Sequence, residues 1–288
     1  MKLPQVLWIG GPPGSGKTTV ARRLARRYGL RWYNSDAHTW EHRDRALAAG
    51  VAAAVRWEAW RAMDEATRAA TPLAEQLTMA LHDERGPMTV DDLLALPSSP
   101  LIVAEGTQIT PKLAGDGSNA LWLIPSREVR RDRLEARHGP GGPPPLYLFL
   151  GQLIEDEVRR AGAQTLVIER ETTVEQTMAA VEEYFADALA SGPKAETAHD
   201  RRALLRYANR AIVSQYRAFF ARPWSSGDLS SAVAAFECEC ADPECDANVE
   251  LPVTDFPTPP DDHTSPPVVA AGHSHPDFRS GRAGHPEV

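Results

Sequence analysis

The sequence predicts an α/β fold: a five-stranded, mostly parallel sheet flanked by helices, followed by a small C-terminal helix and a cysteine-rich module. Two observations indicate the sheet. Five short apolar segments alternate with helical segments over the first 190 residues, which is typical of parallel strands joined by helices. These strands also lack polar alternation, as expected where helices cover both faces of a sheet. The chain has 288 residues, 42% of them hydrophobic, which is ample for such a core.

The predicted strands are short runs of mainly apolar residues, each followed by a glycine, proline or polar residue. They lie at residues 5–10, 31–36, 101–105, 120–124 and 165–168. Parallel strands of this kind end at the same edge of the sheet, and binding sites of open α/β sheets lie at that edge. Side chains that follow these strands are therefore the first candidates for function.

The predicted helices place apolar residues three or four positions apart. The first shows this best, because Val20, Leu24 and Tyr28 share one face, arginines take the opposite face and Gly29 follows as a cap. Helices are expected at residues 17–28, 126–137, 147–160, 173–189 and 199–220, with a mainly helical region at 37–96 in which 51–70 is clearest. Breaks are expected at Thr71–Pro72, Gly86–Pro87 and Gly139–Pro145.

Composition divides the chain into three parts. We expect an α/β domain over residues 1–190, a helix with a cysteine-rich module over 198–275, and a disordered tail over 276–288. From about Pro252 the chain is rich in Pro, Asp, His and Gly, so little packed structure is expected there.

Charge and apolar runs exclude some classes of protein. The net charge of -8 and the pI of about 5.6 disfavour nucleic acid as a general partner. No apolar run approaches the roughly 18 residues that span a bilayer, so no membrane partner is expected. The stretch before the first glycines is too short for a signal peptide. With only three cysteines in the chain, a disulfide scaffold is not expected and a cytoplasmic location is the simplest.

A phosphate-binding loop follows the first predicted strand. The Walker A pattern G-x-x-x-x-G-K-[ST] is matched by Gly11, Pro12, Pro13, Gly14, Ser15, Gly16, Lys17 and Thr18, and Thr19 follows. Its glycines let backbone N–H groups converge on phosphate oxygens, and the next helix directs its positive end at the same anion. Lys17 is expected to bridge the β- and γ-phosphates and Thr18 to bind Mg²⁺. The alternative, a Gly-rich turn with a surface lysine, fits the strand–loop–helix context less well.

The loop predicts ATP and Mg²⁺ as ligands but not a reaction. The guanine-selecting pattern N-K-x-D of GTPases is missing from the sequence, as is the second signature loop of transport ATPases. A Walker B aspartate is also missing in its usual form, because the third strand ends Ala104-Glu105-Gly106.

Residues 4–189 resemble the P-loop small-molecule and nucleoside or nucleotide kinases, which include gluconate, shikimate, antibiotic and polynucleotide 5′-hydroxyl kinases. The resemblance rests on residues 11–19, on Ser35-Asp36, on Glu105-Gly106-Thr107 and on residues 133–137, which look like the family's lid. The triple proline at 143–145 departs from compact kinases. The resemblance implies an ATP-dependent phosphotransferase with a small hydroxylated acceptor as its partner.

Asp36 is the first candidate for catalysis. In these kinases an acid at this place meets the acceptor hydroxyl, and a carboxylate there can accept its proton as the oxygen attacks the γ-phosphorus. The alternative is that Ser35 or Asp36 caps a helix. Glu105 is a candidate for the Mg²⁺ shell or for substrate contact, and its alternative is a solvated strand end.

Arginines crowd the helix at 126–137, and Arg133 and Arg137 lie one turn apart on one face. Such arginines suit the spreading of charge on a transferred phosphoryl group, so both are catalytic candidates. The alternative is a solvated helix whose arginines, including Arg127, Arg130 and Arg131, pair with nearby acids. In the long insertion before the third strand, Trp57, Trp60 and Asp64 lie at helical spacing, and they predict either an acceptor pocket or ordinary core.

All the cysteines lie within eight residues: Cys238, Cys240 and Cys245. In a strand, the first two would share one face, and the turn Asp242-Pro243 could return the third to them. Three thiolates and one further ligand would complete a tetrahedral zinc site. Candidates for the fourth are His263, His273, His275 and His285, of which we favour His273. The alternative is three reduced thiols in a mobile tail. Residues 199–275 are similar to an element of uncharacterised bacterial proteins that brings no known activity.

Four hypotheses follow. The leading one is an ATP-dependent kinase with a small-molecule acceptor. The second is an ATP-binding switch whose zinc-stabilised C-terminal module binds a protein partner. A toxin-like kinase acting on a nucleotide sugar and a polynucleotide 5′-hydroxyl kinase are the third and fourth, and the acidic net charge argues against the last.

Overall fold

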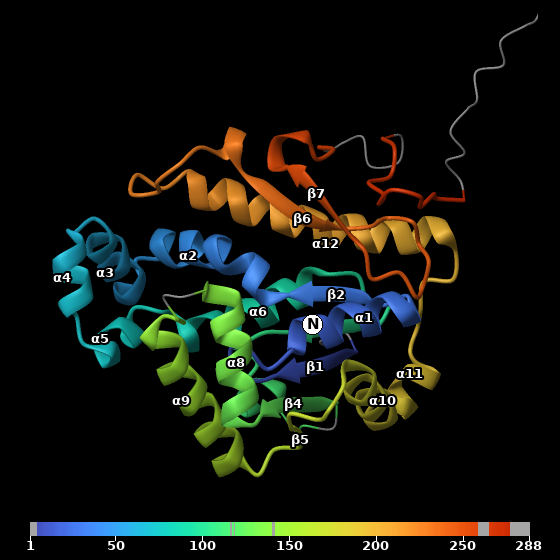
Figure 1. Cartoon of the computed structure of the whole chain (residues 1–288), viewed down its shortest axis with the longest axis horizontal. Coiled ribbons are helices and arrows are strands. Elements are labelled where there is room, and N and C mark those ends of the chain that lie inside the picture. The colour runs from blue at the N-terminus through green and yellow to red at the C-terminus, as the bar shows by residue number, and fades with distance from the viewer. Residues whose placement is uncertain (1–4, 116, 118, 140–141, 259–264, 277–288) are drawn as a thin grey trace, which may run out of the picture.

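A computed structural model describes residues 5–115, 117, 119–139, 142–258 and 265–276 of the chain (Figure 1). Its main sheet contains β1 (Val6–Gly10), β2 (Arg31–Asn34), β3 (Ile102–Glu105), β4 (Ala120–Pro125) and β5 (Thr165–Ile168). The paired strands are all parallel, in the order β2-β3-β1-β4-β5. This architecture confirms the predicted α/β fold class.

Helices cover the sheet, and further helices lie in the insertion before β3 and in the C-terminal segment. They are α1 (Lys17–Tyr28), α2 (Thr39–Ala48), α3 (Ala52–Arg61), α4 (Glu65–Ala70), α5 (Leu73–Thr78), α6 (His82–Ala95), α7 (Pro111–Ala114), α8 (Arg127–His138), α9 (Pro145–Ala161), α10 (Val174–Tyr184), α11 (Ala186–Ser191) and α12 (Ala198–Phe220). Short 3-10 helices are η1 (Ser35–His38), η3 (Leu229–Ser231) and η4 (Val253–Asp255). In the described part of the chain, no helix combines the length and the apolarity that crossing a bilayer requires.

Both faces of the sheet are buried, which explains why its strands lack polar alternation. On one face, Leu7 and Ile9 of β1 pack with Leu24 of α1 and Val181 of α10. On the other, Trp8 and residues of β3 and β4 pack with Leu93 of α6 and with α9. Helix α1 begins and ends where the periodicity predicts, and Gly29 caps it with a φ of 65°.

Several predicted elements differ from the structure. The second strand ends at Asn34 rather than at residue 36, because the Asn34 side chain accepts a hydrogen bond from the Asp36 amide and starts η1. The region 51–70 forms two helices, since Asp64 caps α4. Gly86–Pro87 lies within α6 instead of breaking it. Residues 173–189 form α10 and α11 rather than one helix.

The C-terminal segment packs along the β2 edge of the sheet. Helix α12 runs beside β2 and α2, and an antiparallel hairpin of β6 (Val233–Glu237) and β7 (Asn248–Pro252) lies on α12 (Figure 1). The cluster between them contains Val213, Phe236, Val253, Phe256 and Val268. The expectation of little packed structure after Pro252 is therefore wrong for Val253, Phe256 and Val268. The described chain ends at residue 276, so nearly all of the predicted tail lies outside it.

Candidate functional site

The phosphate loop connects β1 to α1. Gly14 and Gly16 have φ values of 80° and 90°, in the left-handed region that glycine adopts without strain. A Cβ on Gly16 would lie 3.2 Å from the Nη1 atom of Arg133, so this side chain of α8 approaches the loop closely. Helix α1 begins at Lys17, so the N–H groups of its first turn and its positive dipole end adjoin the loop.

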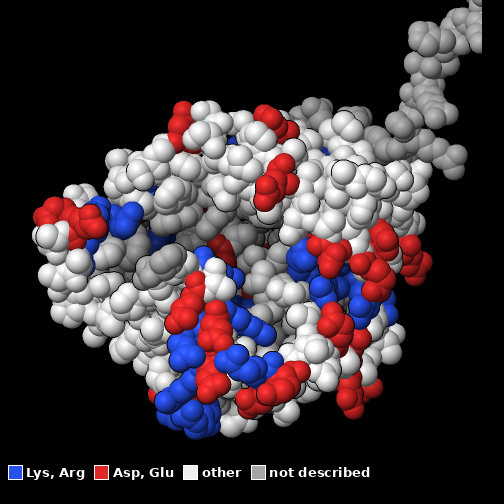
Figure 2. All heavy atoms as spheres, in the orientation of Figure 1, with Lys and Arg blue, Asp and Glu red and all other residues white. Residues whose placement is uncertain are grey.

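A cavity of about 270 Å³ lies against this loop. It is lined by residues 14–20, Asp36, Arg133, Arg137, Ile168, Val174 and Thr177. The structure therefore brings the loop, Asp36 and the two arginines of α8 to one cavity, although they lie on different elements of the fold. Figure 2 shows the hollow on this face of the molecule, with basic and acidic side chains intermingled around it.

Glu105 is the most unusual carboxylate of the site. It is fully buried at the end of β3, paired in register with Ile9 of β1 and Asn34 of β2. Its Oε2 accepts a hydrogen bond of 3.2 Å from Thr18 Oγ1, and its Oε1 is buried without a partner in the described structure. Burial raises the pKa of the Glu105 carboxyl to about 7, against the opposing charge of Lys17. The alternative of a solvated strand end does not describe it.

Asp36 lies in η1 with an exposed side chain. Asn34, not Ser35 or Asp36, supplies the cap of η1, so the capping alternative is wrong. Within the described part of the chain, the Asp36 carboxylate makes no hydrogen bond, whereas its backbone oxygen accepts from Thr39 Oγ1 and from Gln215 Nε2. The backbone is held while the carboxylate is left open to the cavity.

The arginines of α8 divide into two groups. Arg133 donates from Nη1 to the carbonyl oxygens of Gly14 and Ser15, at 3.3 and 3.0 Å, and Arg137 lines the same cavity. Arg130 is buried in an ion pair with Glu155 of α9, and Arg131 is exposed beside acidic neighbours. Arg127 is exposed and does not line the cavity.

The tryptophans of the insertion lie elsewhere. Trp57 and Trp60 are ring neighbours at 4.9 Å, and the Arg43 guanidinium stacks 4.1 Å from the Trp57 ring. Asp64 accepts the Thr67 amide as the cap of α4. None of the three predicted pocket residues lines the cavity at the phosphate loop, so the structure gives no support to the pocket hypothesis.

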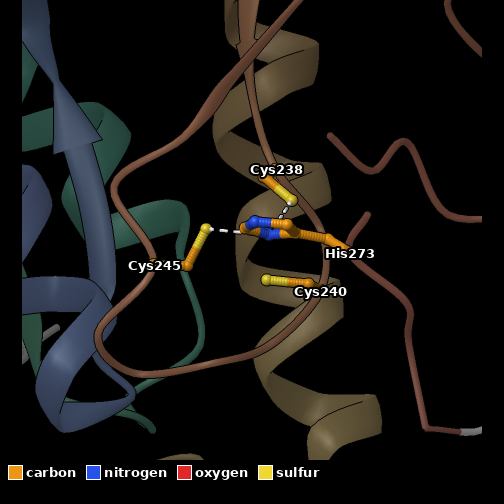
Figure 3. A group of neighbouring side chains, drawn as sticks. All are labelled: Cys238, Cys240, Cys245 and His273. Carbon is orange, nitrogen blue, oxygen red and sulfur yellow. Dashed lines mark hydrogen bonds between the residues drawn. The ribbon is translucent and has the colours of Figure 1, made fainter. Parts of the chain in front are cut away.

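The cysteines meet His273 in a second cluster (Figure 3). One ligand atom from each of Cys238, Cys240, Cys245 and His273 lies within 4.8 Å of the others. The Nδ1 atom of His273 is 3.5 Å from the sulfurs of Cys238 and Cys245. All three thiols are buried and unpaired in disulfides, whereas His273 is exposed. They lie after β6 rather than in a strand, which corrects that detail of the prediction.

Among the described residues, one other candidate histidine, His275, lies apart from this cluster. His275 is buried and its Nε2 contacts the carbonyl oxygen of Ala198 at 3.2 Å, at the start of α12. His263 and His285 lie outside the described residues.

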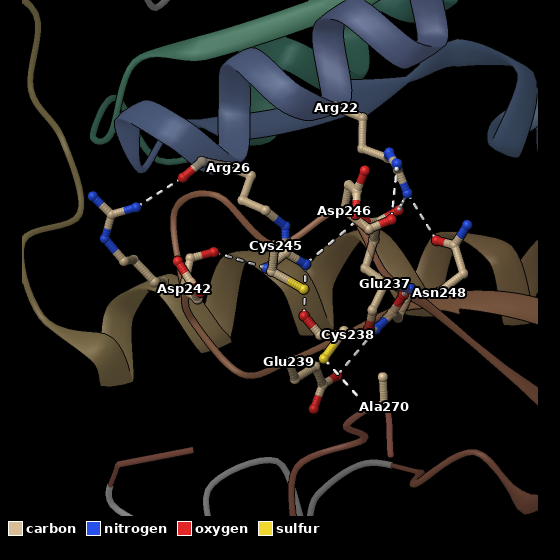
Figure 4. A network of polar contacts seen from close by, with 12 residues as sticks. Arg22, Arg26, Glu237, Cys238, Glu239, Asp242, Cys245, Asp246, Asn248 and Ala270 are labelled. Carbon is tan, nitrogen blue, oxygen red and sulfur yellow. Dashed lines mark hydrogen bonds and ion pairs between the residues drawn. The ribbon is translucent and has the colours of Figure 1, made fainter. Parts of the chain in front are cut away.

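The contacts that attach this cluster to α1 are not predicted by the sequence (Figure 4). The arginines of α1 were expected only to face away from the core. Arg22 and Arg26 instead bind the loop that carries the cysteines, residues 238–247, which we call the cysteine loop, and its flanking strands. The density of arginine on one helix face was the available signal, but the sequence did not indicate a partner more than 200 positions away.

One continuous stretch of the chain, from β1 to just after α8, is similar to a known family of proteins. Residues 7–142 match the family model of the AAA domain. The parallel sheet, its covering helices and this match identify the fold as that of α/β P-loop NTPases. No curated protein matches the chain.

Solved structures are also similar to the chain over about two thirds of its length. They include TT1252 from Thermus thermophilus (22% identity, TM-score 0.41), covering 65% of this chain and 98% of that one. A gluconokinase from Sinorhizobium meliloti 1021 is 16% identical with a TM-score of 0.39, covering 66% and 96%. Shikimate kinase from Acinetobacter baumannii, solved with shikimate, is 18% identical with a TM-score of 0.36, covering 66% and 94%.

Proposed function

We propose that the protein is an ATP-dependent phosphotransferase that moves the γ-phosphate of Mg-ATP to a hydroxyl of a small molecule. One observation carries the proposal. An open carboxylate, Asp36, lines the same cavity as Lys17 of the phosphate loop and the arginines of α8. A nucleotide switch needs the loop but has no use for a carboxylate poised to receive a proton, whereas a kinase needs both.

Different residues of the chain would carry out different parts of the reaction. Asp36 takes the proton of the acceptor hydroxyl while the hydroxyl oxygen bonds to the γ-phosphorus. At the same time the bond between that phosphorus and the β–γ bridging oxygen breaks, and ADP leaves. Lys17 and the loop amides hold the phosphates. Arg133 and Arg137 offset the charge on the transferred group, and a guanidinium suits this because it stays ionised and donates in a fixed planar geometry.

The residues around Glu105 fit a magnesium ion. A buried carboxylate oxygen without a partner beside the Thr18 hydroxyl is the oxygen set that Mg²⁺ prefers. Thr18 would hold the ion directly, and Glu105 directly or through water. When bound, Mg²⁺ neutralises phosphate charge and so eases attack on the γ-phosphorus.

We also propose that Cys238, Cys240, Cys245 and His273 bind one zinc ion. With usual zinc–sulfur and zinc–nitrogen bond lengths, a tetrahedral site separates sulfur from nitrogen by about 3.6 Å. The Nδ1 atom of His273 lies 3.5 Å from the sulfurs of both Cys238 and Cys245, which is close to this value. Four protein ligands leave no open position for a substrate, so the role is structural rather than catalytic.

A phosphoryl-transfer experiment tests the kinase. The full chain and its Asp36→Asn variant are incubated with Mg-ATP and a fractionated metabolite extract, supplemented with nucleotide sugars and 5′-hydroxyl oligonucleotides. Mass spectrometry then identifies any phosphorylated species. A product made by the parent protein alone supports the proposal and identifies the acceptor class. Tight ATP binding with slow hydrolysis and no product would instead support the switch and its partner-binding module.

A further inference from the structure

The C-terminal module, residues 198–275, touches both halves of the proposed phosphotransfer site. We propose that this module is a brace, by which we mean that it holds the Asp36 turn in a fixed position relative to the phosphate-loop helix α1. The cysteine loop, with its metal, binds α1, and Gln215 of α12 positions the turn that carries Asp36. This inference rests on the proposed function for its catalytic consequence. Its structural part stands on contacts that are independent of the reaction.

The first link joins the cysteine loop to α1. Arg26 is almost fully buried, and it donates to the carbonyl oxygens of Cys238 at 2.6 Å and of Asp242 at 3.3 Å (Figure 4). Arg22 donates to the Asn248 side chain and to the carbonyl oxygen of Asp246. Converging thiolates would fix this loop with its carbonyl oxygens toward α1. The loop is also acidic, so its charge complements the arginine face.

The second link joins the cysteine loop to α12. Asn209 accepts a hydrogen bond from the amide of Glu237 at 2.7 Å and donates to its carbonyl oxygen at 3.0 Å. Glu239, between the first two cysteines, forms a doubly hydrogen-bonded ion pair with Arg206, at 2.6 Å for each bond. Both side chains of this pair are nearly inaccessible to solvent. Buried and satisfied polar contacts of this kind specify one arrangement of the loop on the helix.

The third link is to the Asp36 turn. One amide group makes both bonds: Gln215 Nε2 donates to the backbone oxygen of Asp36 at 2.9 Å, and its Oε1 accepts the Trp40 amide at 3.1 Å. Arg222, just after α12, binds Asp44 Oδ1 at 2.9 and 3.0 Å. These contacts hold η1 and the start of α2 against α12.

Together, these links fix the distance between Asp36 and the phosphate loop. Asp36 lies beyond the end of the edge strand β2, in the short turn η1. Gln108 and Arg85 bind the buried Ser35 of this turn, whereas Gln215 binds the backbone oxygen of Asp36 itself. The brace ties that turn, through α12 and the cysteine loop, to the helix that begins with Lys17. A shift of about 1 Å in such a group costs on the order of 100-fold in rate. Gln215 is therefore a positioning residue, because it acts through Asp36.

Hydrogen exchange of the full chain tests the brace without any acceptor. The probe is the peptide covering residues 36–44, which contains the Trp40 amide. We expect Gln215→Ala to speed its exchange at least fivefold. Gln215→Glu keeps an acceptor for Trp40 but loses the donor to Asp36, so we expect it to retain the Trp40 protection. The matched control is Gln152→Ala on α9, which removes only a bond to Asp156. Unchanged exchange in Gln215→Ala would overturn the proposal.

Two further measurements test the positioning and the metal. In the transfer assay, we expect Gln215→Glu to lower the turnover number at least fivefold and the Mg-ATP affinity less than twofold. Turnover equal to the parent's would overturn the positioning role. If the parent makes no product, the proposed function fails while the exchange data still decide the brace. Chelation should speed exchange in residues 17–28 and 36–44 together. A change confined to residues 238–247, or a protein purified without metal, would overturn the metal's part.

Discussion

Arg26 of α1 donates a hydrogen bond to the carbonyl oxygen of Cys238 over 2.6 Å, and its side chain is only 5% exposed. The bond joins the helix that follows the phosphate loop to a cluster more than 200 residues later in the chain. Because the bond is buried, loss of Arg26 leaves the Cys238 carbonyl oxygen without this donor, and it removes one of the two arginines, Arg22 and Arg26, that pair with the Glu237 carboxylate. This contact predicts that the two parts of the chain stabilise each other.

Arg26→Ala is expected to lower the free energy of unfolding by about 2–4 kcal/mol, since it strands buried polar partners. Arg131→Ala removes only exposed pairs and should change stability by less than about 0.5 kcal/mol. Urea unfolding of the two variants and the parent measures both effects. Equal stabilities for the two variants would show that the α1 contact is as weak as a surface pair.

Lys17→Ala is expected to weaken Mg-ATP binding about 100-fold, or about 2.7 kcal/mol. The fold should survive because the lysine serves the loop rather than a core. Lys112→Ala, an exposed lysine of α7, is the control and should bind as the parent does. Isothermal titration calorimetry gives the affinities, and a parent-like affinity for Lys17→Ala would remove the phosphate-loop assignment.

Asp36→Asn is expected to lower turnover by roughly 10²–10⁴-fold, the usual contribution of a general base. The melting temperature should stay within about 1 °C of the parent's, because the carboxylate makes no hydrogen bond in the described structure. Asp64→Ala provides the opposite case: it removes the cap of α4, so it should lower the melting temperature and leave turnover unchanged. Should Asp36→Asn lose stability and keep its rate, the base assignment is wrong.

The buried Glu105 predicts a pH dependence of known sign. Burial raises its pKa from an ordinary 4.5 to about 7 in the folded protein. The folded state therefore binds the proton more tightly than the unfolded state. Without nucleotide and Mg²⁺, the contribution of this group to stability is full below pH 4.5 and is lost as the pH rises through about 7.

Glu105→Gln should flatten that part of the stability profile, measured by thermal unfolding between pH 5 and 8. Over the same range, ionisation of Glu105 should strengthen Mg²⁺ binding with nucleotide by about tenfold from pH 6 to pH 8. A parent and a Gln variant with superimposable profiles would contradict the assigned ionisation.

Local patterns predict much of the fold and less of the site. Helix α1 and strand β5 have their predicted bounds because their apolar spacing and flanking glycine or polar residues are local properties. The phosphate loop could be found because its geometry requires a fixed order of residue types. Gly86–Pro87 was predicted as a break, but α6 buries Arg85, Thr89 and Leu93 on either side of it, and packing outweighs the local cost.

The remaining features depend on contacts that no local pattern contains. Asp36 lies in a 3-10 turn because the Asn34 side chain and Gln215 of α12 hold its backbone. The arginines of α1 have binding partners in the cysteine loop only because the C-terminal segment folds back along the sheet edge. Spacing alone left four histidines as candidates, and only the folded chain places His273 beside the thiols.

His273 and His275 therefore provide a matched test of the zinc site, since they are two positions apart and only the first lies at the cluster. We expect the purified parent to hold about one equivalent of zinc by elemental analysis. His273→Ala should weaken zinc binding by at least about tenfold in competition with a chromogenic chelator, because it removes one of the four ligands. His275→Ala should retain parent affinity, since its imidazole contacts the Ala198 carbonyl instead.

Cobalt substitution adds a spectroscopic check, because visible absorption bands of tetrahedral thiolate coordination should appear in the parent and in His275→Ala. A parent protein with less than about a tenth of an equivalent of zinc, and with all three thiols open to titration, would show that the cluster is reduced cysteine alone.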